Sequence, residues 1–324
     1  MAEELRRYRS VAFDSARWEG FRYRDGDIVI STPAKCGTTW VQMLCALLIF
    51  QDPVLPSRLS ELSPWLDIQT RPLPEVLAAL EAQHHRRFIK THTPLDGLPF
   101  DERVTYVSVG RDPRDVALSA DTHWSNMNIE VIIGARAQAV GLDDLVELMP
   151  DGPPERPTDP DDRFEAWVEA DMSEGFSNLA LVVHHLATFW DRRALDNVAL
   201  FHYADLQADL VGEMTRLARV LHIEIDDERV SALATAASFD SMRSRADELA
   251  PESDMAGFWH STAGFFAKGG GGYWRSVVSS ERLARYEARL RALATPDLAE
   301  WVTRGWRGRA SGPDPSARPG TLSR

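Results

Sequence analysis

Residues 27–50 read DIVISTPAKCGTTWVQMLCALLIF, a strand pattern, a short turn and a helix pattern in succession. Residues 27–32 are mostly apolar and β-branched, which is the pattern of a strand covered on both faces. Residues 38–50 open with two threonines and continue as a largely apolar run, which predicts a buried helix. The turn between them consists of small residues, so backbone N–H groups and a helix N-terminus can face an anion there.

Three more β-branched runs are expected to be buried strands, at residues 87–92, 104–110 and 198–203. Helical patterns follow at residues 113–124 and 205–222, the second with Asp205 as its expected N-cap. Strands that alternate with helices predict an α/β fold with a central parallel sheet flanked by helices. Ligands of such sheets bind at the carboxyl ends of the strands. Lys35, His92 and Arg111 each follow a different predicted strand, so we expect them to meet.

The chain has 324 residues, and we interpret residues 1–307 as one domain. Residues 308–324 are rich in Pro, Gly and Ser and are expected to be a disordered tail, while residues 151–162 are expected to form a loop. No repeat is apparent in the sequence.

Acidic residues outnumber basic ones, 49 against 36, and give a net charge of −13. This balance argues against nucleic-acid binding and against attachment to an anionic membrane. An anionic ligand must therefore meet a local basic cluster. The two cysteines, Cys36 and Cys45, form no disulfide framework, and adjacent histidine pairs lack metal-ligand spacing, so no metal site is expected. A charged N-terminus and the lack of an apolar run long enough to span a bilayer predict a cytoplasmic protein without stable membrane insertion.

The turn at residues 31–40 is not a Walker A loop, because Lys35 precedes Gly37 instead of following the last glycine. Taken alone, it is also compatible with an ordinary strand-to-helix connection. An imidazole such as that of His92 is suited to take a proton near neutral pH, and a guanidinium such as that of Arg111 can grip a phosphate bidentately.

Six segments, in the same order along the chain, resemble the motifs of the cytosolic sulfotransferases. The resemblance as a whole extends over roughly residues 27–292. The six segments are the turn STPAKCGTTW at residues 31–40, IKTHTPLD at 89–96, YVSVGRDPRDVALS at 106–119, Tyr203-Ala204-Asp205, Ser238-Phe239 with Met242, and FFAKGGGGYWR at 265–275. Within this family, the chain also resembles mycobacterial sulfotransferases of the glycolipid-modifying kind. The resemblance implies a single α/β domain related to P-loop nucleotide kinases and a sulfuryl transfer from 3′-phosphoadenylyl sulfate (PAPS) that leaves adenosine 3′,5′-bisphosphate (PAP).

The resemblance also implies a role for each matching residue. His92 is the expected general base, and Lys35 and Lys90 are expected to neutralise the leaving phosphate. Arg111 and Ser119 are expected at the 3′-phosphate. The other expected cofactor-binding residues are Cys36, Gly37, Thr38, Thr39, Trp40, Tyr203, Ser238, Phe239, Met242, Lys268 and Gly269.

Structural alternatives stand beside these roles. His92 can be a buried, hydrogen-bonded histidine, Lys90 a solvated strand end, and Arg111 the partner of Asp112 or Asp115. Trp40 and Phe239 can stack on adenine or belong to the core.

The sequence departs from the family pattern at three places of the expected cofactor site. Pro33-Ala34 replaces the usual Tyr-Pro in the wall of the loop. Ala267 stands where arginine is usual, and Cys36 stands where serine is usual. Beside Lys35 and near a helix N-terminus, the Cys36 thiol is expected either to have a lowered pKa or to be an inert filler.

The expected acceptor is a small-molecule or glycolipid hydroxyl, and the sequence is compatible with a phenol, a steroid-like alcohol or a sugar hydroxyl. We expect its pocket to be built from Trp65, residues 124–149 and residues 164–190, which are rich in aromatic side chains. The competing functions are a P-loop kinase or NTPase, which the order of the loop disfavours, and a non-catalytic nucleotide-binding protein. The oligomeric state is not indicated.

Overall fold

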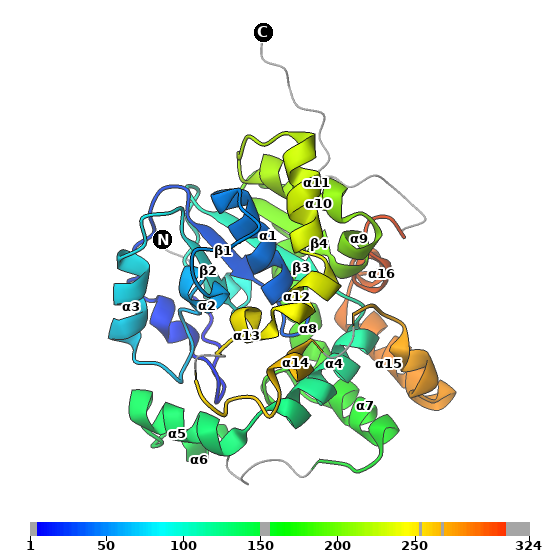
Figure 1. The fold of residues 1–324 in the computed structure, drawn as a ribbon. Coiled ribbons are helices and arrows are strands. Elements are labelled where there is room, and N and C mark those ends of the chain that lie inside the picture. Colours follow the sequence, from blue (N-terminus) through cyan, green and yellow to red (C-terminus); the bar gives the residue numbers. More distant parts are fainter. Residues whose placement is uncertain (1–4, 150–155, 253–254, 267–268, 309–324) are drawn as a thin grey trace.

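A parallel sheet forms the centre of the fold in this computed structural model, which describes residues 5–149, 156–252, 255–266 and 269–308 (Figure 1). Its strands lie in the order β2-β1-β3-β4 and are all parallel. They are β1 (Ile28–Ser31), β2 (Phe88–Thr91), β3 (Thr105–Gly110) and β4 (Val198–His202). Each lies within one of the four predicted runs, so the predicted α/β fold is confirmed.

The α-helices are, in chain order, α1 (Thr38–Phe50), α2 (Leu59–Leu62), α3 (Leu73–Glu81), α4 (Pro113–Asn126), α5 (Ile129–Val140), α6 (Leu145–Leu148), α7 (Pro160–Glu169), α8 (Leu179–Trp190), α9 (Tyr203–Ala208), α10 (Leu210–Val220), α11 (Asp227–Ala236), α12 (Phe239–Ser244), α13 (Ala246–Leu249), α14 (Thr262–Phe265), α15 (Ser280–Leu293) and α16 (Pro296–Arg304). Short 3-10 helices are η1 (Ser15–Trp18), η2 (Leu95–Gly97) and η3 (Tyr273–Ser276).

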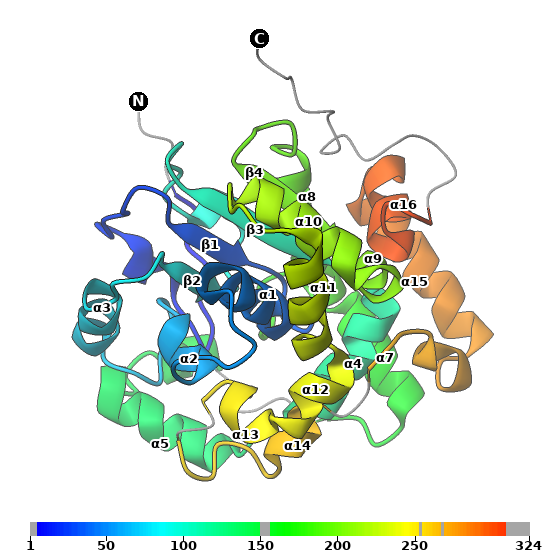
Figure 2. The same ribbon diagram turned by 45° about the horizontal axis from the view of Figure 1, so that its top comes forward.

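Helices cover both faces of the sheet, and every residue of its four strands is buried. Ile28 and Ile30 belong to the core shared with α1, α10 and α11, which lie over the near face of the sheet in both views (Figures 1 and 2). Val29 points the other way, into the core shared with α8 and α16. Because side chains alternate along a strand, β1 supplies both layers and must be apolar throughout.

Three of the predicted element boundaries are wrong. The helix expected over residues 205–222 is two helices, because Asp209 leaves the helical conformation (φ −154°, ψ 76°) and its carboxylate caps α10 at Gly212 N. Asp205 is not an N-cap but is buried and accepts hydrogen bonds from the backbone of Trp306 and Arg307. The helix expected over 113–124 continues to Asn126.

The third difference lies at the end of the predicted loop over residues 151–162. Its last three residues already belong to α7, because Asp159 caps that helix and Pro160 opens it. Residues 151–155 of that loop, and residues 309–324 of the expected tail, lie outside the described part of the chain. Among the helices of the described part, none combines the length and the apolar character needed to cross a membrane.

Candidate functional site

The turn after β1 presents the free N-terminus of α1 to a cavity. Gly37 occupies the N-cap position with φ 108° and gives no side-chain cap, so the first N–H groups of α1 are left for a ligand. A β-carbon at Gly37 would lie 3.2 Å from the Tyr203 ring, so this position requires glycine for space as well as for φ. The hydroxyls of Thr38 and Thr32 lie 2.6 Å apart and brace the start of the helix.

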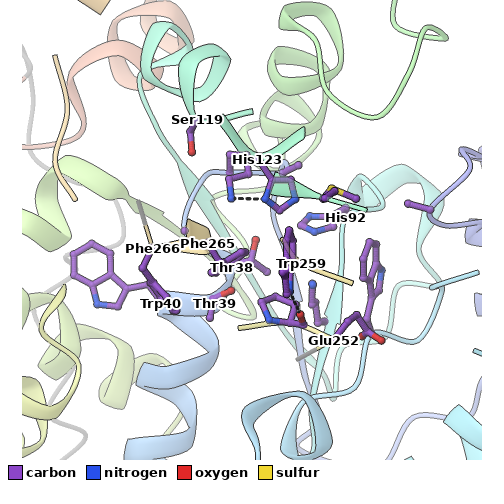
Figure 3. Close-up of a pocket in the computed structure, with 18 of the residues that line it drawn as sticks. Thr38, Thr39, Trp40, His92, Ser119, His123, Glu252, Trp259, Phe265 and Phe266 are labelled. Atoms are coloured by element: carbon purple, nitrogen blue, oxygen red, sulfur yellow. Dashed lines mark hydrogen bonds between the residues drawn. The ribbon is translucent and has the colours of Figure 1, made fainter. Parts of the chain in front are cut away.

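Lys35 turns its ammonium into the same cavity. Lys35 itself has a left-handed backbone (φ 68°), which aims the side chain away from the sheet toward α4 and α14. Its Nζ lies 3.0 Å from His123 Nδ1 and 4.5 Å from the centre of the Phe265 ring (Figure 3). Burial, together with the positive charges of Arg111 and Lys90, lowers the pKa of Lys35 to about 7.

Arg111 lies behind Lys35 and joins two loops. Its guanidinium donates to the carbonyl oxygen of Lys35 at 2.9 Å and to that of Gly270 at 3.0 Å, and it stacks 4.2 Å from the Tyr203 ring. Its buried Nε has no hydrogen-bond partner among the described residues. Such an orphaned donor on a cation, beside a free helix N-terminus, fits an anionic ligand.

The alternative role for Arg111, a partner of Asp112 or Asp115, is not observed. Asp112 pairs with Arg114 at 2.7 Å, and Asp115 accepts a hydrogen bond from Gly272 N at 2.8 Å. The guanidinium of Arg111 is instead bonded to the carbonyl oxygens of Lys35, which lines the cavity, and of Gly270.

His92 faces the cavity from the end of β2. Its Nδ1 lies 2.8 Å from the carbonyl oxygen of Thr32, which only accepts, so Nδ1 carries the proton and Nε2 keeps its lone pair. The rings of Trp65 and Phe176 pack edge-on against the imidazole, with centroids 4.9 and 5.5 Å away. Burial and the nearby Lys90 hold the pKa of His92 well below its usual value, so the ring is neutral at physiological pH.

Lys90 is buried, and its alternative role as a solvated strand end is wrong. Its side chain is 5% exposed, and its Nζ lies 4.2 Å from the centre of the Trp65 ring. Burial lowers the pKa of Lys90 to about 8, against the raising effect of Glu252 and Asp67. With Lys35 and Arg111 it forms the local basic cluster expected in this acidic chain.

One cavity of about 190 Å³ brings most of the predicted site residues together (Figure 3). Those that line it are Lys35, Gly37, Thr38, Thr39, Trp40, Lys90, His92, Arg111, Ser119, Tyr203, Phe239 and Met242. Trp40 is anchored by a hydrogen bond from its Nε1 to the Ala237 carbonyl, and its ring meets Tyr203 edge-on at 5.2 Å. Trp40 therefore packs on its neighbours and still presents a surface to the cavity.

Three predicted cofactor residues do not line the cavity. The side chain of Cys36 is completely buried in the core on the α8 side of the sheet, and burial raises its thiol pKa to about 12, so the expected lowered pKa is wrong. Ser238 caps α12 by accepting from Ser241 N. Gly269 lies under the Phe239 ring, where a β-carbon would come within 2.7 Å of the ring. Lys268 and Ala267 lie outside the described residues.

The acceptor pocket was predicted in part. Trp65, Trp124, Met127, Ile132 and Phe176 line the cavity as expected. The two ends of the expected range 164–190 do not line the cavity. Phe164 packs against Tyr286, and Trp190 packs against Trp301, both in the core.

Other residues that line the cavity carry no role predicted from the sequence. They are Ala12, Ala34, Ile68, Thr70, His123, Gln207, Pro251, Glu252, Phe258, Trp259, Phe265 and Phe266. The aromatic residues of this set precede the glycine-rich run in the sequence, and that clustering was the available signal. Within the described ranges, no group of three or more His, Cys, Asp or Glu side chains has the arrangement of a metal site.

Sequence comparisons with known proteins identify relatives over most of the chain. The sulfotransferase domain model matches residues 25–296. The glycolipid sulfotransferase of Mycobacterium bovis is 46% identical over 311 residues, which cover 93% of this chain and 95% of that protein.

Solved structures show the same fold at low sequence identity. Retinol dehydratase, in complex with androsterone and the inactive cofactor PAP, aligns with a TM-score of 0.66 at 20% identity, over 87% of this chain and 86% of that one. A mouse sulfotransferase complexed with PAP aligns with a TM-score of 0.65 at 16% identity, over 89% of this chain and 90% of that one. The predicted P-loop-like α/β fold is thereby confirmed.

Proposed function

Because the chain belongs to the sulfotransferase domain family and is a PAPS-dependent sulfotransferase, we propose that its acceptor is a hydroxyl of a glycolipid and that His92 is the general base. The observation that carries the role of His92 is its fixed tautomer. His92 Nδ1–H donates to the Thr32 carbonyl oxygen, so the proton stays on Nδ1. The Nε2 lone pair is then available in the cavity, which Lys90 also lines. PAPS supplies an activated sulfuryl group whose leaving partner is a phosphate.

The chain provides both proton removal and charge stabilisation. His92 Nε2 takes the proton of the acceptor hydroxyl while the acceptor oxygen forms its bond to sulfur and the bond from sulfur to the phosphate oxygen breaks. Lys35 and Lys90 are placed to stabilise the negative charge that the phosphate oxygen gains. This work needs no metal ion, since buried cations and a helix N-terminus supply the positive field.

The nucleotide half of the cavity is assigned to the residues around α1 and α12. Arg111 and Ser119 are proposed at the 3′-phosphate, and the first N–H groups of α1, with Gly37, Thr38 and Thr39, at the 5′-phosphosulfate. The rings of Trp40, Tyr203 and Phe239 are proposed at the adenine. Met242 completes this wall of the cavity.

A glycolipid acceptor fits the aromatic wall of the cavity and the apolar surface next to it. Trp124 both lines the cavity and is 38% exposed. Large exposed apolar side chains follow in the sequence at Ile129 and Val140 of α5, at Leu142, and at Val146 of α6. Aromatic rings can stack on the apolar face of a sugar, and an exposed apolar strip can hold alkyl chains that leave the cavity. The relatives named glycolipid sulfotransferases support the same assignment.

Transfer of labelled sulfuryl from PAPS to defined acceptors tests this proposal. The acceptors are a neutral glycolipid, its sugar headgroup without alkyl chains, a simple phenol and a steroid alcohol, each assayed with EDTA present. We expect transfer to the glycolipid to have the highest kcat/KM. The headgroup alone should have a higher KM and a similar kcat. Preferential transfer to the phenol or the steroid would overturn the acceptor assignment, and a strict magnesium requirement would overturn the metal-free mechanism.

A further inference from the structure

His123 is the residue of the cavity whose position calls for a chemical explanation. It lies on α4, one helical turn after Ser119, and both side chains point toward the cavity (Figure 3). Its Nδ1 is 3.0 Å from Lys35 Nζ. The sequence motifs gave it no role.

The imidazole of His123 is held by aromatic neighbours. Its centroid lies 5.0 Å from that of Trp259 and 5.8 Å from that of Phe265, and Phe265 also faces the Lys35 ammonium. The Lys35 ammonium therefore has two contacts, with a ring nitrogen of His123 on α4 and with the ring face of Phe265 on α14. These contacts join the turn after β1 to α4 and α14.

The charges around the pair fix the direction of its hydrogen bond. Burial and the cations Lys35 and Lys90 hold the pKa of His123 well below its usual value, so the ring is neutral and its Nδ1 accepts from the ammonium. Desolvation by burial and the charges of Arg111 and Lys90 act against the charged form of Lys35. A neutral acceptor at 3.0 Å favours the protonated lysine, which is the form that can stabilise a leaving phosphate.

We propose that His123 is a positioning residue for sulfuryl transfer: its imidazole accepts a hydrogen bond from Lys35 and holds that ammonium, charged and oriented, in the cavity. This inference rests on the role proposed above for Lys35. It assigns no contact between His123 and either substrate.

Two variants separate the hydrogen bond from the packing of the ring. His123→Phe keeps a ring beside Trp259 but cannot accept a hydrogen bond, whereas His123→Asn loses the ring and keeps an oxygen near the position of Nδ1. We expect kcat of His123→Phe to fall about 10- to 100-fold, the equivalent of one hydrogen bond to a charged group. His123→Asn should retain most of the wild-type kcat. A role in packing alone predicts the opposite order.

The pH dependence of kcat/KM for PAPS gives a second readout. Loss of the acceptor lowers the pKa of Lys35, so the alkaline limb of the profile should move to lower pH in His123→Phe and stay in place in His123→Asn. The other titratable groups near the pair, namely Lys90, His92, Arg111 and Cys36, are the same in both variants. Thermal unfolding of each variant shows whether a loss of rate reflects loss of the fold.

Lys35→Ala distinguishes a failure of this inference from a failure of the proposed mechanism. If Lys35→Ala keeps wild-type turnover, the proposed role of Lys35 is wrong and the inference falls with it. If Lys35→Ala is impaired but folded His123→Phe has the rate and the pH profile of the wild type, only the inference is overturned. In the Lys35→Ala background, His123→Phe should cause no further loss, because the group that it positions is absent.

Discussion

Arg111 donates a hydrogen bond to the carbonyl oxygen of Gly270 at 3.0 Å, and so ties the end of β3 to a glycine-rich segment 159 residues later in the chain. The same guanidinium reaches the carbonyl of Lys35 at 2.9 Å. One buried cation therefore joins two loops, of which the turn at Lys35 lines the cavity. A planar, multidentate donor suits this task, whereas a lysine presents a point charge.

Arg111→Lys should weaken PAP binding about 10- to 100-fold, because it removes at least one hydrogen bond to a charged group and loosens both loops. Isothermal titration calorimetry with PAP measures the effect. Arg114→Lys is the matched control, since Arg114 pairs with Asp112 and stacks on Trp274 at 4.0 Å, and it does not line the cavity. Equal losses of affinity in the two variants would remove Arg111 from the phosphate site.

Binding of PAP should take up protons at mildly alkaline pH. In the free protein the pKa of Lys35 is lowered to about 7, so at pH 8 most of this side chain is neutral. A bound phosphate anion favours the ammonium and raises that pKa, so the proton enters on binding and the affinity falls as pH rises above 7. Lys90, with its pKa lowered to about 8, adds to the uptake at higher pH.

Calorimetry in buffers of different ionisation enthalpy measures this uptake directly. The number of protons taken up at pH 8 should exceed the number at pH 6, and Lys35→Ala should reduce it. An observed binding enthalpy that does not depend on the buffer at pH 8 would contradict the low pKa of Lys35 in the free protein.

Cys36 should react slowly with alkylating reagents, and bound PAP should change its rate little. Its side chain has no exposed surface, and burial raises the pKa of its thiol to about 12, so thiolate is scarce at neutral pH. Mass spectrometry after timed alkylation measures this rate, with the denatured protein as the control for full reactivity. Rapid labelling of native Cys36 that PAP blocks would show a thiol facing the cavity.

The short strands and the turn after β1 could be predicted because local sequence determines them. A short, β-branched, apolar run is typical of a strand buried on both faces. The side chains of β1 accordingly belong to both layers of the core. The ends of three parallel strands had to share one edge of the sheet, so the meeting of Lys35, His92 and Arg111 followed from topology.

The parts of the site that sequence could not predict depend on contacts between distant segments. His123 and Phe265 lie 142 residues apart (265 − 123) and meet only because α14 packs on α4. Sequence left two alternatives for the Cys36 thiol, and only the packing of the core, which buries it, decides for the inert one. The break between α9 and α10 likewise depends on the conformation of Asp209.

The kcat of sulfuryl transfer should stay nearly constant as pH falls from 7 to about 6. Burial keeps the pKa of His92 well below its usual value, so this base stays neutral as pH falls to about 6, where a solvent-exposed histidine would be largely protonated. The pH profile of kcat with a glycolipid acceptor checks this. An acid limb centred near pH 6.5 would mean that the base is more exposed in the working enzyme.

The proposed role of His92 as the base that removes the acceptor proton can be tested by comparing one variant with the wild type. The initial rate of sulfuryl transfer from labelled PAPS to a glycolipid is measured for the wild type and for His92→Ala, with PAP affinity measured on the same preparations. We expect the rate to be lower by about 10²- to 10⁴-fold in His92→Ala, with nearly unchanged PAP affinity. A His92→Ala protein that binds PAP normally and transfers sulfuryl at close to the wild-type rate would contradict it.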